Sequence, residues 1–125
     1  MEEQVPANLK NAAILQLVSG LLNFTIMPVI VYFTLALCCG LATFWAFGIG
    51  AVCGFVGFVL WPIGIFEIVS GGMTLANPKS GGKIMKICSY VELGSILCGG
   101  LVSCVAGGVV MSMLKDEEVT AYLEG

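Results

Sequence analysis

The chain has 125 residues, of which 58% are hydrophobic and only 10% are charged, and its mean hydropathy is +1.03. Soluble globular domains carry about a quarter charged residues, so this composition excludes an ordinary water-soluble protein and predicts a protein of the lipid bilayer. The net charge of -3 and the lack of any basic cluster exclude nucleic-acid binding. Because the chain has no histidine and no arginine, the usual nucleophile–base pairs cannot be assembled, and we expect no enzyme.

The apolar sequence is long enough to cross a bilayer several times. Glu67 is the only charged residue between Lys10 and Lys79, whereas one spanning helix needs only about 20 residues. Apolar runs without alternation predict helices, so the expected fold is an all-α integral membrane bundle of four transmembrane helices in a single domain. The predicted spans are 9–27, 28–47, 50–75 and 83–114, with short polar tails at 1–8 and 115–125.

This division into spans depends on proline and glycine. The chain is predicted to turn at Pro28, at Gly48–Gly50 and at Asn77–Gly82. In the alternative, Pro28 and Pro62 only kink their helices, and three long helices result. The positive-inside rule favours three helices, because Lys10 then joins the lysines near the last turn. Four spans avoid a helix of about 54 Å, which exceeds a bilayer core of about 30 Å.

Two short segments of the chain are alike. Gln16–Gly20 and Glu67–Gly71 match in order and kind, and a proline follows each of them at a similar distance. This pattern indicates a duplicated helical hairpin, whose copies would be parallel because the matched helices run in the same direction in the four-span arrangement. Chance similarity between two apolar helices is the alternative.

Small residues recur at helical spacing on the last two predicted spans. The third span carries Gly50, Gly57, Gly64 and Gly71 at intervals of seven, and the fourth carries Ser95, Gly99, Ser103 and Gly107 at intervals of four. Helices in lipid associate through close backbone approach over such residues. We therefore predict two helix-packing seams, which serve either within one chain or between the copies of a homo-oligomer.

Two carboxyl groups fall within the apolar segments. Glu67 and Glu92 flank the last turn by about ten residues on either side, so both reach a depth of about 15 Å. Gln16 and the Cys38–Cys39 pair come to this level if the chain reverses at Pro28. An ionised group in the bilayer centre costs about 3 kcal/mol or more, and two neighbouring carboxyls cannot both stay ionised. Glu67, Glu92 and Gln16 are therefore the candidate proton or ion site, with hydrogen bonds that only specify packing as the alternative.

No metal and no cofactor are predicted. The six cysteines show no paired CxxC spacing and histidine is absent, so a zinc or haem site has no support. We expect the cysteines to be buried free thiols that pack as small apolar side chains.

The C-terminal tail has an amphipathic pattern. Val119, Tyr122 and Leu123 recur at helical spacing between charged residues. This predicts a frayed helix end, or a short helix that lies on the membrane surface or on a partner.

Three segments of the chain resemble a group of bacterial proteins. The opening Pro6–Leu15 with the following Val18–Gly20 and Asn23, the central Gly64–Gly71 and the ending Glu118–Glu124 are similar to small multi-span bacterial membrane proteins. This resemblance implies a location in the bacterial inner membrane and no known activity.

Two functions follow as predictions from these features. The first is a polytopic membrane protein that self-associates through its glycine seams and has a structural or membrane-organising role, with lipid and further copies of the chain as partners. The alternative is a channel or transporter component that conducts protons or cations through Glu67 and Glu92.

Overall fold

The structure is a computed structural model that describes residues 4–42, 54–98 and 100–125. Within these ranges the chain is all-α and contains no strand, so the predicted fold class is confirmed at that level. The α-helices are α1 (Ala7–Thr25), α2 (Met27–Ala42), α4 (Leu60–Ala76), α5 (Pro78–Gly94), α6 (Leu101–Leu114) and α7 (Glu117–Glu124). Two short 3-10 helices, η1 (Val56–Val59) and η2 (Ser95–Cys98), precede α4 and follow α5.

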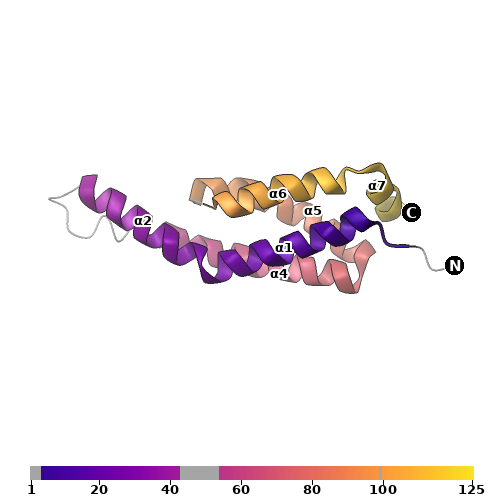
Figure 1. The fold of residues 1–125 in the computed structure, drawn as a ribbon, viewed down its shortest axis with the longest axis horizontal. Helices are drawn as coiled ribbons and strands as arrows, with labels where there is room; N and C mark the ends of the chain where they lie inside the picture. Colours follow the sequence, from indigo (N-terminus) through magenta and orange to yellow (C-terminus); the bar gives the residue numbers. More distant parts are fainter. Residues whose placement is uncertain (1–3, 43–53, 99) are drawn as a thin grey trace.

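The first two helices form one long, bent rod (Figure 1). α1 and α2 meet at Ile26 with a bend of 48°. Pro28 lies in the first turn of α2, where its missing N–H removes no helical hydrogen bond. The predicted reversal of the chain at Pro28 is therefore wrong, and the rod bends there as in the three-helix alternative.

The returning half of the chain builds the rest of the bundle. α4 runs back along α1, and α5 and α6 form a hairpin beside this pair (Figure 1). Asn77 alone joins α4 to α5, and its side chain accepts a hydrogen bond from the N–H of Ser80. Gly81 packs directly on the backbone of Thr74, so no larger residue fits this connection without movement. The turn is confirmed where it was predicted, but it is shorter because α5 begins at Pro78.

The predicted span 83–114 is divided between two helices. α5 ends at Gly94, and α6 begins at Leu101 and packs back against α5. Ser95 Oγ donates to the carbonyl oxygen of Glu92 at 2.6 Å and lies 3.1 Å from that of Gly100, which stabilises the turn between the helices. The continuous fourth span is therefore wrong, and η2 interrupts it.

One described helix has the length and composition of a membrane span. It is formed by η1 and α4 together, Val56–Ala76. The α1–α2 pair would be a second span if its bent halves are counted together, and α6, with 14 residues, is shorter than a usual crossing. Among the described residues one helix, or two if the bent pair counts as one span, is thus long and apolar enough to cross a membrane, so the four predicted spans are not confirmed.

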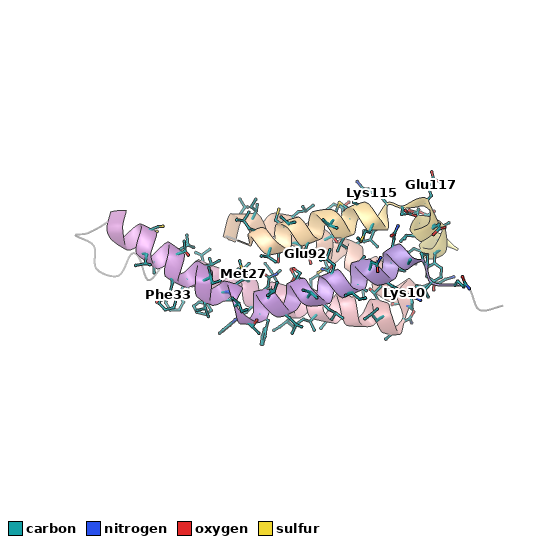
Figure 2. The ribbon with its side chains drawn as sticks, in the orientation of Figure 1. Lys10, Met27, Phe33, Glu92, Lys115 and Glu117 are labelled. Atoms are coloured by element: carbon teal, nitrogen blue, oxygen red, sulfur yellow. The ribbon has the colours of Figure 1, made fainter. Side chains whose placement is uncertain are left out.

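The five lysines gather toward one end of the molecule. α1 begins there, α4 and α5 are joined there, and α6 ends there, so the topology brings Lys10 and Lys115 to the same end as the lysines of α5 (Figure 2). The four-span arrangement predicted these lysines on opposite sides. For Lys10 the difference follows from the bent rod, which does not reverse at Pro28, and for Lys115 it follows from the turn between α5 and α6.

α7 covers this end of the bundle. Val119 is fully buried, and the side chain of Leu123 lies against Gly82 of α5. Asn8 Nδ2 donates to the carboxylate of Asp116, the N-cap of α7, at 3.0 Å. The C-terminal tail is therefore a docked helix rather than a frayed end.

The two similar segments lie against each other. A Cβ on Gly20 of α1 would stand 2.8 Å from the carbonyl oxygen of Gly64 in α4, and a Cβ on Gly71 would stand 2.8 Å from that of Ala13. The register of the sequence match, carried three residues toward the N-terminus, relates these two contacts, because it pairs Ala13 with Gly64, Leu17 with Ile68 and Gly20 with Gly71. Since α1 and α4 are antiparallel, the match is inverted about a local two-fold axis, and the parallel duplicated hairpin was a wrong prediction.

Candidate functional site

Part of the interior of the bundle formed by α1, α4, α5 and α6 is polar, and an apolar cluster that includes Leu9, Met85 and Val119 lies beside it. Glu67 and Glu92 are fully buried in the polar part. The other buried polar side chains among the described residues are Gln16, Ser19 and Asn23 of α1, Ser70 and Thr74 of α4, Ser89 of α5, Ser95 of η2 and Ser103 of α6. All five lysines lie in described ranges and none is buried, so no basic side chain shares this polar core.

Asn23 and Ser103 hold the carboxyl group of Glu67. Nδ2 of Asn23 lies 3.0 Å from one oxygen of Glu67 and 2.8 Å from the other. Ser103 Oγ donates to the same carboxyl and accepts from Asn23, whose Nδ2 also lies 3.3 Å from Ser19 Oγ. Three helices, α1, α4 and α6, are thereby tied together at Glu67.

Gln16 and Cys88 hold the carboxyl group of Glu92. Gln16 Nε2 donates to Oε1 of Glu92 and lies 3.2 Å from the sulfur of Cys88, which in turn lies 3.8 Å from the same oxygen. Gly107 of α6 closes the other side, because a Cβ there would stand 2.7 Å from Cβ of Glu92. Any larger residue at position 107 would displace the carboxyl.

The two carboxyl groups also act on each other. Both are fully buried in the core between α1, α4, α5 and α6. With no basic side chain in the core, two ionised carboxylates would repel each other in a medium that screens poorly. The pair therefore needs at least one proton or one cation as a companion.

The structure brings some of the predicted site residues together and leaves others apart. Gln16 contacts Glu92, and Glu67 lies in the same polar core, so these three residues are brought together. Cys38 is exposed on α2 and takes no part, because α2 leads away from the core. Cys88 of α5 occupies the place beside Glu92 instead.

The sequence analysis missed Asn23 as a member of the site. A signal was present, because Gln16, Ser19 and Asn23 recur after three and then four residues and so share one face of α1. On α4 the same spacing is found in Glu67, Ser70 and Thr74. Polar residues at helical spacing within an apolar segment therefore indicate the inner face of a helix.

The glycine seams face helices of the same chain. A Cβ on Gly64 would stand 2.8 Å from the backbone nitrogen of Phe24, and a Cβ on Gly57 would stand 2.9 Å from the side chain of Val31. Since α1 and α2 fill this groove, a second copy cannot enter it without displacing them. Ser95, Ser103 and Gly107 are buried within the chain, while Gly50 and Gly99 lie outside the described residues.

The arrangement can hold a small positive charge away from water. Its ligating atoms are carboxyl, amide and hydroxyl oxygens, which suit a proton or a hard cation. No cluster of three or more histidine, cysteine, aspartate or glutamate side chains suited to a metal ion occurs in the described ranges. Comparison with protein-family models, with curated proteins and with solved structures gave no match to this chain.

Proposed function

We propose that this chain is a small helical protein of the bacterial inner membrane and a component of a proton- or cation-translocating system. The observation that carries the proposal is the full burial of Glu67 and Glu92 in one polar core without a basic side chain. Ionisable groups within membranes are costly and are typical of proton relays and ion pathways. Glu67 and Glu92 bind the ion, and Gln16 and Asn23 orient their carboxyl groups.

The outer surface supports a place in the bilayer. Large apolar side chains are at least half exposed on every long helix of the bundle, among them Val18, Phe33, Ile65 and Leu101. Water-soluble monomers rarely expose apolar surface to this extent. The lysine-rich end would face the cytoplasm under the positive-inside rule, together with the start of α1 and the end of α7.

Ion flux in proteoliposomes tests the proposal. The purified protein is reconstituted into sealed vesicles that contain a pH-sensitive dye, and a potassium gradient with valinomycin supplies the driving potential. Glu67→Gln and Glu92→Gln should each abolish proton or cation flux, because glutamine keeps the shape and can hydrogen-bond but cannot carry the charge or release a proton. Glu118→Gln removes an exposed carboxyl of α7 and should conduct like the wild type.

Two results would contradict this function. One is a wild-type protein whose flux does not exceed that of empty vesicles. The other is a Glu67→Gln or Glu92→Gln variant that conducts normally. Circular dichroism and gel filtration show whether each variant keeps its helices and its size, so a loss of flux is not confused with misfolding.

A self-associating structural role is the second candidate. Other helices of the same chain pack directly on the seam glycines that the structure describes, so a second copy has to pack elsewhere. Gly72, Gly94 and Gly108 favour such contacts, because open space surrounds the position of a Cβ at each of them. The particle mass in detergent should then be a discrete multiple of 13.1 kDa, whereas a monomer at all protein-to-detergent ratios would refute this role.

A further inference from the structure

A cavity of about 160 Å³ lies at the lysine-rich end of the molecule, where α7 packs against the start of α5. It is enclosed by α5, the end of α6 and α7, and its lining includes Leu114, Thr120, Leu123 and the three charged residues Lys83, Lys86 and Glu124. Pockets for drug-sized ligands measure about 300–1,000 Å³. This smaller cavity therefore suits a compact polar group.

The charged residues give the cavity a net positive charge. Lys83 and Lys86 are three residues apart on α5, so they are neighbours on one side of that helix, and both are exposed. Glu124 of α7 contributes one negative charge, which leaves a net charge of +1 from two lysines and one glutamate. A group with one negative charge and several oxygen acceptors complements this set, and a phosphodiester has both properties.

An apolar surface of α5 continues from the two lysines away from this end. Ile87 is four residues after Lys83, and Tyr90 is four residues after Lys86. All four residues therefore share one side of α5. Ile87 and Tyr90 are 61% and 60% exposed. A ligand that fits both the cavity and this surface has an anionic head and a hydrocarbon tail.

We propose that the cavity binds the headgroup of an anionic phospholipid from the leaflet on the lysine-rich side. Lys83 and Lys86 bind its phosphate, and its acyl chains lie along Ile87 and Tyr90. Basic pockets between helices at the membrane surface are typical sites for such headgroups. A headgroup with a single negative charge, as in phosphatidylglycerol, matches the net charge of the cavity. The inference rests on the membrane location in the proposed function and does not depend on ion translocation.

Lipid binding to the full-length purified protein tests the site. The protein is delipidated in a non-ionic detergent and mixed with phosphatidylglycerol, or with phosphatidylcholine that has the same acyl chains, and native mass spectrometry counts the bound lipids. We expect one phosphatidylglycerol per chain at concentrations at which no phosphatidylcholine is retained, because only the first lipid is anionic. Glycerophosphoglycerol, the same headgroup without acyl chains, should not displace the lipid at equal concentration. Equal displacement would indicate a site for free phosphodiesters and refute the lipid site.

Two matched pairs of lysine substitutions separate the cavity from general attraction between charges. Lys83→Gln combined with Lys86→Gln should weaken phosphatidylglycerol binding about tenfold or more, because both phosphate ligands are lost. Lys10→Gln combined with Lys115→Gln removes the same charge from the same end of the molecule (Figure 2), but neither residue lines the cavity. This control should bind phosphatidylglycerol like the wild type. All four lysines are exposed, so neither pair of changes disturbs the core.

Replacement of the acidic residue should have the opposite effect. Glu124→Gln removes the negative charge from the lining of the cavity and should tighten phosphatidylglycerol binding about twofold or more. Glu117→Gln removes an exposed carboxyl of the same helix that does not line the cavity, and it should leave binding unchanged. Weaker binding by Glu124→Gln would contradict the proposed site.

The results distinguish the lipid site from the proposed function. Equal binding of the two lipids, or equal losses in the two double lysine variants, would overturn the lipid site, whereas ion flux by the wild type in proteoliposomes would still support translocation. A wild-type protein that retains phosphatidylglycerol as expected but does not conduct would support the lipid site and contradict translocation. A wild-type protein that neither retains the lipid nor conducts would overturn both.

Discussion

The close crossing of α1 and α4 predicts that Gly64 cannot be enlarged without cost. A Cβ at this position would stand 2.8 Å from the backbone nitrogen of Phe24, 2.9 Å from the carbonyl oxygen of Gly20 and 3.1 Å from the carbonyl carbon of Asn23. Ordinary contact of a Cβ begins at 3.4 Å, and all three neighbours are backbone atoms that cannot rotate away. Gly64→Ala should therefore push the two helices apart.

The expected cost follows from comparison with Gly72→Ala. Gly72 lies on the same helix, but a Cβ there would meet nothing within 4 Å. Both variants gain the same stability from helix propensity, about 1 kcal/mol at most. Only Gly64→Ala is also destabilised by overpacking, which typically lowers stability by about 1–3 kcal/mol. Gly64→Ala should thus be less stable than Gly72→Ala by about 1–3 kcal/mol.

Unfolding in detergent measures this difference. Cys88 is fully buried beside Glu92, so its reaction with a thiol-reactive fluorophore reports opening of the core, once the other five cysteines have been replaced by serine in all proteins compared. Gly64→Ala should also disturb the bond between Asn23 and Glu67, because Asn23 lies at the displaced contact. Equal unfolding temperatures for Gly64→Ala and Gly72→Ala would show that α1 and α4 do not approach as closely as described.

Other parts of the molecule give three further predictions. A membrane-impermeant amine reagent should label all five lysines from one side of sealed vesicles only, because they lie toward one end; labelling from both sides, read by mass spectrometry, would contradict this. Asp116→Ala should weaken α7 by about 1 kcal/mol and speed its proteolysis, because Asp116 caps that helix, whereas exposed Glu117→Ala should not. Gln16→Glu should lower the free energy of unfolding by about 3 kcal/mol at neutral pH, because it adds an unpaired charge beside Glu92. Mildly acidic pH should restore the stability of this variant, because protonation removes the repulsion. Equal stability of the variant at both pH values would refute this prediction.

The shared depth of the Glu67 and Glu92 carboxyl groups along their helices could be predicted from the sequence alone. Depth along a helix follows from counting residues, and the turn at Asn77 was clear from the proline that follows it. Both Glu67 and Glu92 are indeed buried in one core. What counting does not supply is the identity of the partners, since Asn23 reaches Glu67 only because α1 and α4 cross where glycines allow it.

The path of the chain after Pro28 could not be predicted in this way. Proline in a first helical turn is compatible with a bend and with a reversal, so the local signal is the same for both. Packing further along decides between them. Tyr32 of α2 packs edge-on against Phe55 and at a tilt against Phe58, at ring distances of 5.8 and 5.6 Å, and Gly57 admits the backbone of α2. These contacts hold α2 beside the start of the returning helix and away from the core.

The turn between α5 and α6 was missed for a different reason. It contains neither proline nor charge, and its small residues fit the spacing of a helix seam. The hydroxyl of Ser95 is instead used by backbone carbonyls at both ends of the turn, which is the local competition by which serine ends a helix.

The local two-fold axis explains where the charge of the core comes from. The inverted match pairs Gln16, Ser19 and Asn23 with Glu67, Ser70 and Thr74, and both rows contact the α5–α6 hairpin. An exact repeat would have a carboxyl on each of α1 and α4, but Gln16 leaves only one there. The second carboxyl comes from Glu92 of the hairpin, so the charge pair spans the contact between the α1–α4 pair and α5. A shift of the hairpin would therefore change the separation of the two carboxyls, on which the proposed translocation depends.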